Sequence, residues 1–474
     1  MFHRCFMGSS NYDVAVIGAG PGGYKCAIKA AKLGLSVVCI DKNSQWGGTC
    51  LRVGCIPSKA MLEYSYKFHS AKDLFPKLGV MAKDVAFDLK KMFEVRDNEI
   101  AVLSSGIDGL FSAAGVHKLR AEAKIAGKKG DFFEVVLSNQ DGSLGQVLAR
   151  NVVLATGSTP TSLPGIDVDG DSVIFSDGAL SMDVPKRLLV IGGGAIGLEM
   201  SSIWSRLGSE VTVVEYADKI ASGFDADISK ALQGFLEKQG IKFNLAQKVV
   251  SVAKGNTGLL VNCESVVNGA MASMEVDKVL VAVGRSPSIT GVVAMDGLLL
   301  DNRGFVCVNN RYETSIKGIY AIGDVIGGAM LAHKAEIEGH AVAELIAGNV
   351  TQVDYGVIPA VIYTHPAAAS VGRGEESLKS VNYKYKVGKS SFAANGRARV
   401  ACDSDGFVKV IACKETDVIL GVHIVGAHAD TMINEAAVAL GYRATAKDIC
   451  HICHSHPDVN EVFRDACEVV SHKR

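Results

Sequence analysis

The sequence predicts an α/β protein with two Rossmann-like dinucleotide-binding domains and a C-terminal α+β domain. The main observation is a pattern that occurs twice: an apolar strand, a glycine-rich turn, a helix, and a second strand followed by an acid. The first copy has its turn at residues 18–23 and its acid at Asp41, and the second has them at 192–197 and Glu215. In each copy the acid follows the first glycine by 23 positions. One Gly-x-Gly-x-x-Gly run is weak evidence, but two in the same register indicate two dinucleotide sites in one chain.

Each element of the repeat has a physical role in holding a dinucleotide. Glycines let the backbone approach the pyrophosphate without a Cβ clash, and the amide groups at the start of the following helix face its negative charge. The terminal acid accepts hydrogen bonds from ribose hydroxyls. Glu215 also repels a 2′-phosphate, and no Arg follows it at 216–218, so the second site favours NAD over NADP. The residues expected to line the two sites are Gly18, Gly20, Gly23, Asp41, Gly192, Gly194, Gly197 and Glu215.

Short strands on either side of the second repeat mark where the chain leaves the first domain and returns to it. The apolar run 152–155 ends at a glycine turn, and the run 279–283 ends at a similar turn that begins at Gly284. Strands such as 406–411 and 420–424, next to helices rich in Ala, Val and Glu, predict an α+β third domain. We therefore expect the first dinucleotide-binding domain at 1–159, the second at 160–284, a return segment of the first at 285–352, and the third domain at 353–474.

Composition excludes several classes of function. The chain has 474 residues and is 48% hydrophobic, which indicates a well-filled protein of two or three domains. Its 49 basic and 50 acidic side chains give a net charge of −1, so no basic field is available for nucleic acid or a membrane surface. No apolar run reaches the roughly 18 residues of a membrane-spanning helix. Residues 1–10 contain one Arg and no acid, which fits either a short mitochondrial presequence or a tail without function.

Two of the twelve cysteines stand apart from the others. Cys50 and Cys55 lie five positions apart within 47–59, soon after the first dinucleotide unit. A paired thiol beside a flavin can move two electrons between a dithiol and a nicotinamide. The remaining cysteines are too scattered for a disulfide framework. Those in strand-like or helix-like apolar patterns are expected to be buried small hydrophobic residues, namely Cys26, Cys39, Cys263, Cys307, Cys402 and Cys413.

Three segments carry a resemblance to a known family. They are 47–59 with its two cysteines, the run 330–336 (Met-Leu-Ala-His-Lys-Ala-Glu), and the run 453–457 (Cys-His-Ser-His-Pro). With these segments the chain resembles the class I pyridine nucleotide-disulfide oxidoreductase flavoproteins from about Tyr12 to Glu468, and within them the enzymes that oxidise dihydrolipoamide. The resemblance implies FAD at the first glycine turn, NAD at the second, a C-terminal dimerisation domain, and active sites that two subunits share.

The resemblance also implies roles for individual residues. Cys50 is expected to exchange with lipoamide and Cys55 to lie against the flavin, and the two form a redox-active disulfide. His456 is expected to be the acid–base catalyst, held by Glu461. Lys59 is expected near the flavin N5 and paired with Glu199, and Val249 and Gly284 are expected near NAD. The further positions implied for FAD contact are Gly48, Thr49, Thr156, Gly157, Ser158, Asp324, Met330, Leu331, Ala332 and His333.

The expected reaction is the oxidation of protein-bound dihydrolipoamide to lipoamide, with NAD as the electron acceptor. A thiol must become a thiolate to attack a disulfide, and a His oriented by a carboxylate can take its proton at neutral pH. The expected partners are a second copy of the chain and the lipoyl domain of a 2-oxo-acid dehydrogenase, glycine-cleavage or acetoin-type complex. The expected location is the mitochondrial matrix in a eukaryote and the cytoplasm otherwise.

Other interpretations stay open. A glutathione-type or other disulfide reductase shares the scaffold, and a mainly structural subunit of a complex with diaphorase activity is a second alternative. The run Cys450-x-x-Cys453-His454 matches a haem-attachment pattern, and with His456 it also resembles a zinc site. We expect neither haem nor metal there. The favoured interpretation is a helix that places both cysteines in an apolar interface, with His456 at its end.

The chain departs from the family pattern at a few positions. It has Arg52 where Asn is usual, Asp458 where Thr is usual, Asp41 where Glu is common, and Ala367 where a Glu follows the His-Pro pair. A cation at Arg52 is expected to favour a cysteine thiolate, and a second carboxylate at Asp458 is expected to favour a protonated His456. These differences bear on rate and substrate preference, not on the fold.

Overall fold

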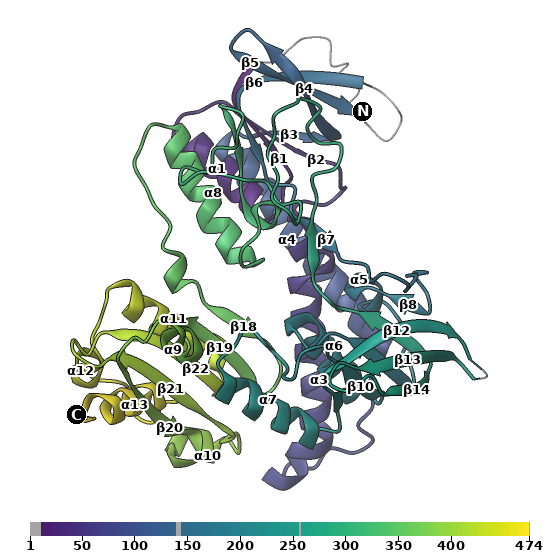
Figure 1. The fold of residues 1–474 in the computed structure, drawn as a ribbon, viewed down its shortest axis with the longest axis vertical. Coiled ribbons are helices and arrows are strands. Elements are labelled where there is room, and N and C mark those ends of the chain that lie inside the picture. The colour runs from purple at the N-terminus through teal and green to yellow at the C-terminus, as the bar shows by residue number, and fades with distance from the viewer. Residues whose placement is uncertain (1–10, 139–143, 256, 474) are drawn as a thin grey trace. The chain divides into compact units, whose positions relative to one another are not determined.

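The computed structural model describes residues 11–138, 144–255 and 257–473, and it separates into two compact units (Figure 1). Unit 1 contains Met1–Pro57, Lys90–Thr161 and Gly284–Val353, and unit 2 contains Ser58–Leu89, Ser162–Val283 and Asp354–Arg474. Each unit is therefore assembled from segments that lie far apart in the sequence. The presequence interpretation falls on residues 1–10, outside the described residues.

Unit 1 is built on a seven-stranded sheet in the order β3-β2-β1-β6-β5-β4, with β17 also paired to β6. β1 (Asn11–Ile17) lies between β2 (Val37–Asp41) and β6 (Leu144–Leu154), and the three strands are parallel. Parallel strands covered on both faces are almost continuously apolar, which explains the apolar runs of β1 and β2. β3 (His117–Arg120) and β17 (Ile319–Ala321) extend the parallel part, while β4 (Glu122–Lys129) and β5 (Phe132–Ser138) are antiparallel.

Helix α1 (Pro21–Lys32) packs against β1 and β2 and lies side by side with α8 (Ala332–Ile346). The two helices meet at glycines. A Cβ added at Gly339 would lie 2.4 Å from the Gly22 carbonyl oxygen, and a Cβ added at Gly22 would lie 2.9 Å from the Ala335 carbonyl oxygen. The backbones therefore touch, and this contact holds α8 against a helix more than 300 positions earlier in the chain.

Substituting Gly339 by alanine is expected to lower the free energy of unfolding of unit 1 by about 1–3 kcal/mol, because the new methyl group overlaps backbone atoms of α1. The midpoint of thermal unfolding, followed by circular dichroism, measures this loss. The matched control is Gly106→Ala in the exposed part of α4 (Leu89–Ala114), where no atom lies within 4 Å of an added Cβ. There alanine is expected to stabilise by about 0.5–1 kcal/mol. A Gly339→Ala midpoint at or above that of the wild type would contradict the close helix contact.

The chain leaves unit 1 and returns to it through two paired strands. β7 (Ser158–Pro160) and β16 (Arg285–Pro287) form a two-stranded antiparallel ribbon. The segment Ser162–Val283, which belongs to unit 2, connects them. Two shorter elements of unit 1, the 3₁₀ helix η3 (Gly323–Ile326) after β17 and helix α2 (Gly48–Val53), carry candidate site residues. Helix α3 (Cys55–His69) follows α2 after a single residue.

Unit 2 repeats the strand, turn and helix order of unit 1. Its parallel sheet has the order β11-β10-β9-β15-β8, and α6 (Ala195–Arg206) follows β9 as α7 (Ala226–Lys238) follows β10. The strands are β8 (Val173–Ile174), β9 (Arg187–Ile191), β10 (Glu210–Val214), β11 (Lys242–Asn244) and β15 (Lys278–Val281). An antiparallel sheet packs beside them, with strands β12 (Gln247–Lys254), β13 (Leu259–Ser265) and β14 (Met271–Val276).

The C-terminal part of unit 2 is an antiparallel sheet covered by helices. The sheet has the order β18-β19-β22-β21-β20, and helices α11 (Ala429–Gly441) and α13 (Glu461–Ser471) pack on it to form one apolar core. The strands are β18 (Ala360–Ile362), β19 (Ala367–Gly372), β20 (Tyr385–Ser391), β21 (Gly406–Cys413) and β22 (Ile419–Gly426), and the shorter helices are α9 (Glu375–Ser380), α10 (Gly396–Val400) and α12 (Ala446–His451). This α+β arrangement, with the two parallel sheets, confirms the predicted fold class.

The predicted burial of the cysteines is confirmed for four of the six. Cys26, Cys39, Cys263 and Cys413 are buried, but Cys307 and Cys402 are exposed. Cys402 lies in a turn after α10 with a φ of 55°, and Cys307 alternates with Val306, whose side chain faces the core. Helix α12 contains Cys450, which packs against the core, but it ends at His451 and leaves Cys453 exposed. The prediction of a helix that carries both cysteines is therefore wrong for Cys453, which lies beyond the end of α12.

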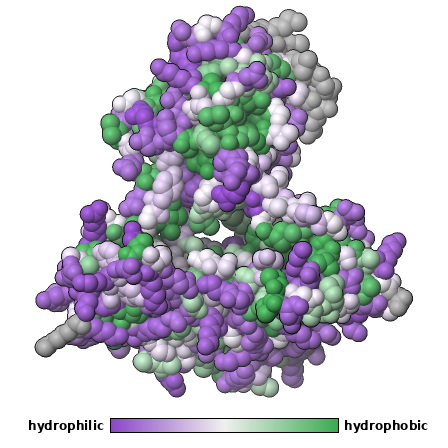
Figure 2. Space-filling view, in the orientation of Figure 1, coloured by the Kyte–Doolittle hydropathy of each residue, from purple (hydrophilic) through white to green (hydrophobic). Residues whose placement is uncertain are grey.

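On the face that Figure 2 shows, hydrophilic residues predominate and hydrophobic residues gather in patches among them. Within the described ranges, no helix combines the length and apolar character needed to cross a membrane. In the same ranges, no group of three His, Cys, Asp or Glu side chains is placed to hold a metal ion.

Candidate functional site

The two glycine turns have nearly identical geometry. Gly18 and Gly192 have φ angles of 100° and 109°, a region that disfavours any residue with a Cβ. A Cβ at Gly23 would lie 1.8 Å from the Gly18 carbonyl oxygen, and one at Gly197 would lie 2.0 Å from the Gly192 carbonyl oxygen. Only glycine fits the first and last positions of each turn, which lets the strand end pack directly against the helix start.

The terminal acids close the same turns. Asp41 accepts the Ala19 N–H at 2.7 Å with Oδ2 and the Asn43 N–H at 2.8 Å with Oδ1. The side chain of Glu215 accepts the Gly193 N–H at 2.5 Å with Oε2 and the Ala217 N–H at 2.8 Å with Oε1. The sequence predicted these acids as ribose acceptors only. In the structure they also fix the second residue of each turn, a role that depends on backbone geometry and has no sequence signal of its own.

The turns have room for the groups that the resemblance implies. A Cβ at Gly194 would meet no atom within 4 Å, so the space above the second turn is open to a pyrophosphate. In unit 1 the hydroxyl of Thr156, one of the implied FAD contacts, is buried and has no hydrogen-bond partner among the described residues. A buried hydroxyl without a partner is costly, and a polar cofactor atom would satisfy it. The residues present therefore fit FAD in unit 1 and a dinucleotide in unit 2.

A cavity of about 300 Å³ lies beyond Asp41 in unit 1. Arg120 stacks on the Trp46 ring with its guanidinium carbon 3.6 Å from the ring centroid, and Trp46 Nε1 donates to Asp108 at 2.8 Å. Sequence reasoning missed this cavity, although a Trp directly before Gly47 was a visible signal. The cavity is lined by Ser44, Gln45, Trp46, Ala101, Ser104, Ser105, Asp108 and Arg120.

The segment 47–59, which contains Cys50 and Cys55 and is called the redox loop from here on, contacts the first glycine turn directly. A Cβ at Gly48 would lie 2.5 Å from the Gly20 Cα, and the Gly47 N–H donates to the Ala19 carbonyl oxygen at 3.0 Å. Cys50 lies in α2 and Cys55 is the first residue of α3. The chain folds back between them, since a Cβ at Gly54 would lie 3.2 Å from the Cys50 Cα. Arg52 Nε is buried there and has no hydrogen-bond partner in the described part of the chain.

The 3₁₀ helix η3 of unit 1 contains Asp324, whose carboxylate lies beside the Ser158 hydroxyl. Ser158 donates to Asp324 Oδ2 at 2.5 Å, and Arg285 Nε donates to Ser158 Oγ at 2.7 Å. Beneath this turn, Lys334 and Glu338 form a buried ion pair at 3.0 Å. Lys334 donates to the Gly327 carbonyl oxygen, and Glu338 accepts the Gly323 N–H at 2.7 Å. The segment 330–333 continues from the turn into the first residues of α8.

Lys59 and Glu199, both in unit 2, form an ion pair at 2.7 Å. The other oxygen of Glu199 accepts the Tyr363 N–H at 3.0 Å, and Lys59 Nζ lies 4.5 Å from the centroid of the Tyr363 ring. Glu199 is buried while Lys59 is half-buried. The carboxylate therefore fixes the Lys59 ammonium group, as the resemblance implied for this pair.

His456 and Glu461 meet at the start of α13. His456 Nδ1 lies 3.0 Å from Glu461 Oε1, and the Asp458 N–H donates to Glu461 Oε2 at 3.0 Å. These two contacts, the backbone one first, lower the pKa of Glu461, so it stays ionised near neutral pH. The His456 side chain is 78% exposed. The Asp458 carboxylate instead accepts the Asn460 N–H at 2.8 Å.

The structure thus gathers the predicted residues into groups within each unit. Val249 lies on β12 with its side chain in the core, and Gly284 has a φ of 130° with open space around it. Unit 1 holds Gly18, Gly20, Gly23, Asp41, Gly48, Thr49, Cys50, Cys55, Thr156, Gly157, Ser158, Gly284, Asp324, Met330, Leu331, Ala332 and His333. Unit 2 holds Lys59, Gly192, Gly194, Gly197, Glu199, Glu215, Val249, His456 and Glu461.

Relatives with established names match nearly the whole chain. A pea protein named dihydrolipoyl dehydrogenase, mitochondrial, is 46% identical over 97% of this chain and 91% of its own length. A pig protein of the same name is 46% identical over 96% of this chain and 89% of its own length. A soybean protein named leghemoglobin reductase is also 46% identical, over 97% of this chain and 87% of its own length.

Solved structures show the same fold. The crystal structure of LpdA from Mycobacterium tuberculosis matches with a TM-score of 0.88 at 24% identity, covering 97% of this chain and 99% of that one. The HOCl-induced flavoprotein disulfide reductase RclA from Escherichia coli matches with a TM-score of 0.84 at 23% identity, covering 97% of this chain and all of that one.

Two family models cover most of the chain. Residues 12–339 match the pyridine nucleotide-disulphide oxidoreductase model, and residues 358–467 match the dimerisation domain of the same family. The expected cofactors, FAD and NAD, are those of this family and are confirmed, and the dimerisation domain implies a homodimer. The chain belongs to the pyridine nucleotide-disulphide oxidoreductases.

Proposed function

We propose that the protein is a dihydrolipoyl dehydrogenase, which oxidises protein-bound dihydrolipoamide to lipoamide and reduces NAD. The observation that carries the proposal is the seating of the redox loop on the first glycine turn, where Gly48 touches Gly20. This contact places the segment with Cys50 and Cys55 next to the turn that would hold FAD. The full-length relatives named dihydrolipoyl dehydrogenase support the choice of substrate.

The first glycine turn, Asp41 and the turn at Asp324 are assigned to FAD. The second turn, with Glu215, is assigned to NAD because its acid disfavours a 2′-phosphate. The corresponding segments are 1–159 and 285–352 for the FAD domain, 160–284 for the NAD domain, and 353–474 for the dimerisation domain. Bound FAD supplies a two-electron acceptor between the cysteine pair and NAD.

The cysteine pair carries the substrate chemistry. A thiolate of dihydrolipoamide attacks Cys50 Sγ of the Cys50–Cys55 disulfide, so that a mixed disulfide forms and Cys55 leaves as a thiolate. The second lipoyl thiol loses its proton to His456 Nε2 and displaces Cys50, which releases lipoamide with its own disulfide. Glu461 holds His456 through Nδ1 and stabilises the imidazolium that forms. Both cysteines are then reduced, and the two electrons taken from the dithiol continue to NAD.

The partner is assigned as the lipoyl domain of a 2-oxo-acid dehydrogenase, glycine-cleavage or acetoin-type complex. A lipoyl group on such a domain presents the disulfide–dithiol couple that Cys50 exchanges with. The mitochondrial matrix is the proposed location, supported by the mitochondrial names of the plant and animal relatives.

Stopped-flow absorbance of the FAD-loaded dimer tests this function. Dihydrolipoamide is expected to reduce the protein within one turnover and to produce a long-wavelength band from a Cys55 thiolate beside the flavin, and added NAD is then expected to yield NADH. A flavin spectrum that dihydrolipoamide leaves unchanged, while NADH bleaches it, would reject the proposal. It would favour a reductase of another disulfide or of a haem protein, since a relative of equal identity is named leghemoglobin reductase.

A further inference from the structure

A row of polar side chains crosses the C-terminal sheet of unit 2. Lys389 on β20 pairs in register with Lys409 on β21, which pairs with His423 on β22, which pairs with Ser370 on β19. Lys409 is 1% exposed and His423 is 2% exposed. A lysine and a histidine so deeply buried in apolar strands are rare without partners. His423 bonds Ser370 Oγ through Nδ1 and the Arg373 carbonyl oxygen through Nε2.

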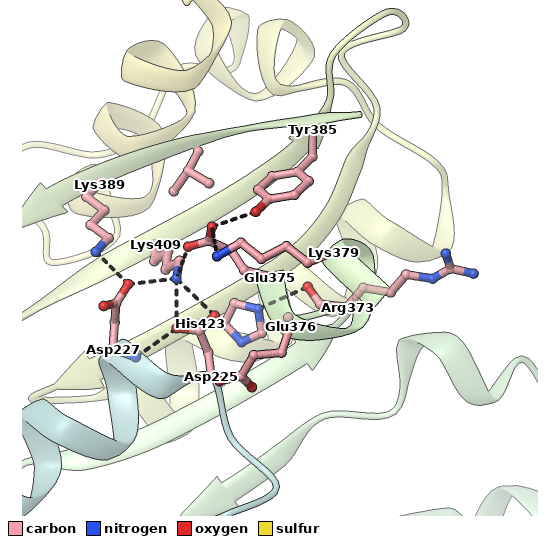
Figure 3. A network of polar contacts seen from close by, with 12 residues as sticks. Asp225, Asp227, Arg373, Glu375, Glu376, Lys379, Tyr385, Lys389, Lys409 and His423 are labelled. Carbon is pink, nitrogen blue, oxygen red and sulfur yellow. Dashed lines mark hydrogen bonds and ion pairs between the residues drawn. The ribbon is translucent and has the colours of Figure 1, made fainter. Parts of the chain in front are cut away.

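The partners of Lys409 are carboxylates from two other elements, α7 and α9 (Figure 3). Lys409 Nζ lies 2.8 and 2.9 Å from the two oxygens of Asp225, and 2.7 Å from Asp227 Oδ2. It also lies 2.6 Å from Glu375 Oε1 in α9. One ammonium group therefore joins the start of α7, in the nucleotide-binding part of unit 2, to the C-terminal sheet.

The network is balanced in charge. Lys389 pairs with Asp227 at 2.6 Å, and Lys379 pairs with Glu375 at 3.5 Å. Three lysines thus face three carboxylates. Burial alone would lower the pKa of Lys409, but the hydrogen bonds that its ammonium group donates to Asp225, Asp227 and Glu375 raise it. Burial would raise the pKa of Asp227, but the two lysines lower it to about 2. Both groups therefore stay ionised at physiological pH.

The loop 216–225 begins directly after Glu215 and leads to the carboxylates at the start of α7. Asp225 is the N-cap of α7 and accepts the Asp227 N–H. Ser229, in the first turn of α7, donates to the Ala221 carbonyl oxygen at 3.1 Å. Ala221 in turn donates its N–H to the Gly193 carbonyl oxygen at 2.8 Å. A continuous chain of contacts thus runs from Lys409 to the second glycine turn.

We propose that Lys409 is a positioning residue for NAD. By holding Asp225 and Asp227, it fixes the start of α7 and the loop 216–225 against the glycine turn that receives the dinucleotide. This inference rests on the assignment of NAD to that turn in the proposed function. It means that a residue of the dimerisation domain sets the shape of the nucleotide site, although it does not touch the nucleotide itself.

The test is the affinity of NAD for the oxidised, FAD-loaded dimer, measured by isothermal titration calorimetry. Lys409→Met removes the ammonium group and leaves buried carboxylates without a counter-charge. It is expected to weaken NAD binding on the order of tenfold. Lys409→Arg, which keeps the charge, is expected to restore most of the affinity. The KM for NAD should rise while the KM for dihydrolipoamide and the rate of flavin reduction by dihydrolipoamide stay unchanged.

The matched control is Lys386→Met on the same strand as Lys389. Lys386 pairs at 2.7 Å with Asp417 and is also mostly buried, but Asp417 belongs to the C-terminal part, where its side chain accepts the Lys447 N–H. Its loss is expected to leave NAD affinity unchanged. A folded Lys409→Met dimer with the wild-type affinity for NAD would overturn the proposal.

A milder variant covers the case in which Lys409→Met does not fold. Asp227→Asn keeps the Lys409–Asp225 pair and removes one charge at the start of α7, so it is expected to weaken NAD binding about threefold. An unchanged affinity in folded Asp227→Asn would likewise overturn the proposal. Wild-type protein that binds no NAD would instead reject the assignment of the second turn, and with it the proposed function.

Discussion

Replacing Cys50 by serine is expected to slow dihydrolipoamide oxidation by about a thousandfold or more, because a hydroxyl cannot form the disulfide that the substrate opens. Transfer of electrons from NADH to a dye is expected to survive, since neither glycine turn is altered. Parallel steady-state assays with dihydrolipoamide and NAD, and with NADH and a dye, measure the two activities. The contrast between them separates a lost redox group from a misfolded protein.

The control for this variant is Cys453→Ser. Cys453 is exposed and lies outside the redox loop, beyond the end of α12, so near-normal turnover is expected. Normal dihydrolipoamide turnover in Cys50→Ser would refute the role of the cysteine pair. A joint loss of both activities would show that the substitution had disturbed the first glycine turn, on which the redox loop sits.

Replacing His456 by glutamine is expected to slow the reduction of the flavin by dihydrolipoamide about a hundredfold to ten thousandfold. Glutamine can accept a hydrogen bond but cannot take the thiol proton. The ionised Glu461, whose pKa is lowered by the Asp458 N–H and His456, would remain in place without an imidazolium to stabilise. Single-turnover stopped-flow measurement of flavin reduction by dihydrolipoamide, compared with reduction by NADH, locates the loss in the thiol half-reaction.

His454→Gln is the matched control, two positions away. His454 bonds Glu435 at 2.9 Å and its side chain is only 7% exposed, so its loss is expected to affect stability more than thiol exchange. Equal slowing in the two variants would show that the segment acts through its shape. Wild-type thiol exchange in His456→Gln would remove this histidine from the mechanism.

The sequence predicted features whose residues lie close together along the chain. The glycine turns with their strands and helices are local patterns whose spacing predicts their geometry, whereas the pair His456 and Glu461 was implied by the family resemblance. Lys409 was not predicted, because Asp225 lies 184 positions away. The only signal was a lysine inside the apolar strand 406–413, and such a signal identifies a buried charge without naming its partners.

Predictions about three single residues show a different limit. Cys307 and Cys402 lie in apolar patterns but are exposed, because Cys307 lies between two isolated β-bridge residues whose side chains face the other way and Cys402 lies in a turn. The effect of the Asp458 carboxylate on His456 stays a prediction, and the structure shows that this group accepts the Asn460 N–H. Its backbone N–H reaches Glu461 instead. Composition and spacing cannot tell which polar group of a residue takes part in a contact.

The pairing of β17 with β6 has a consequence for synthesis of the chain. The end of β6 at Leu154 gains this neighbour only when Ile319–Ala321 have been made, and the intervening residues include the whole nucleotide-binding part of unit 2. At the usual pace of translation this delay is on the order of ten to thirty seconds. During that interval a buried apolar strand presents an open edge to the ribosome surface and to other nascent chains. The inserted segment can thus form its own parallel sheet before β17 has been made and can join the sheet of unit 1.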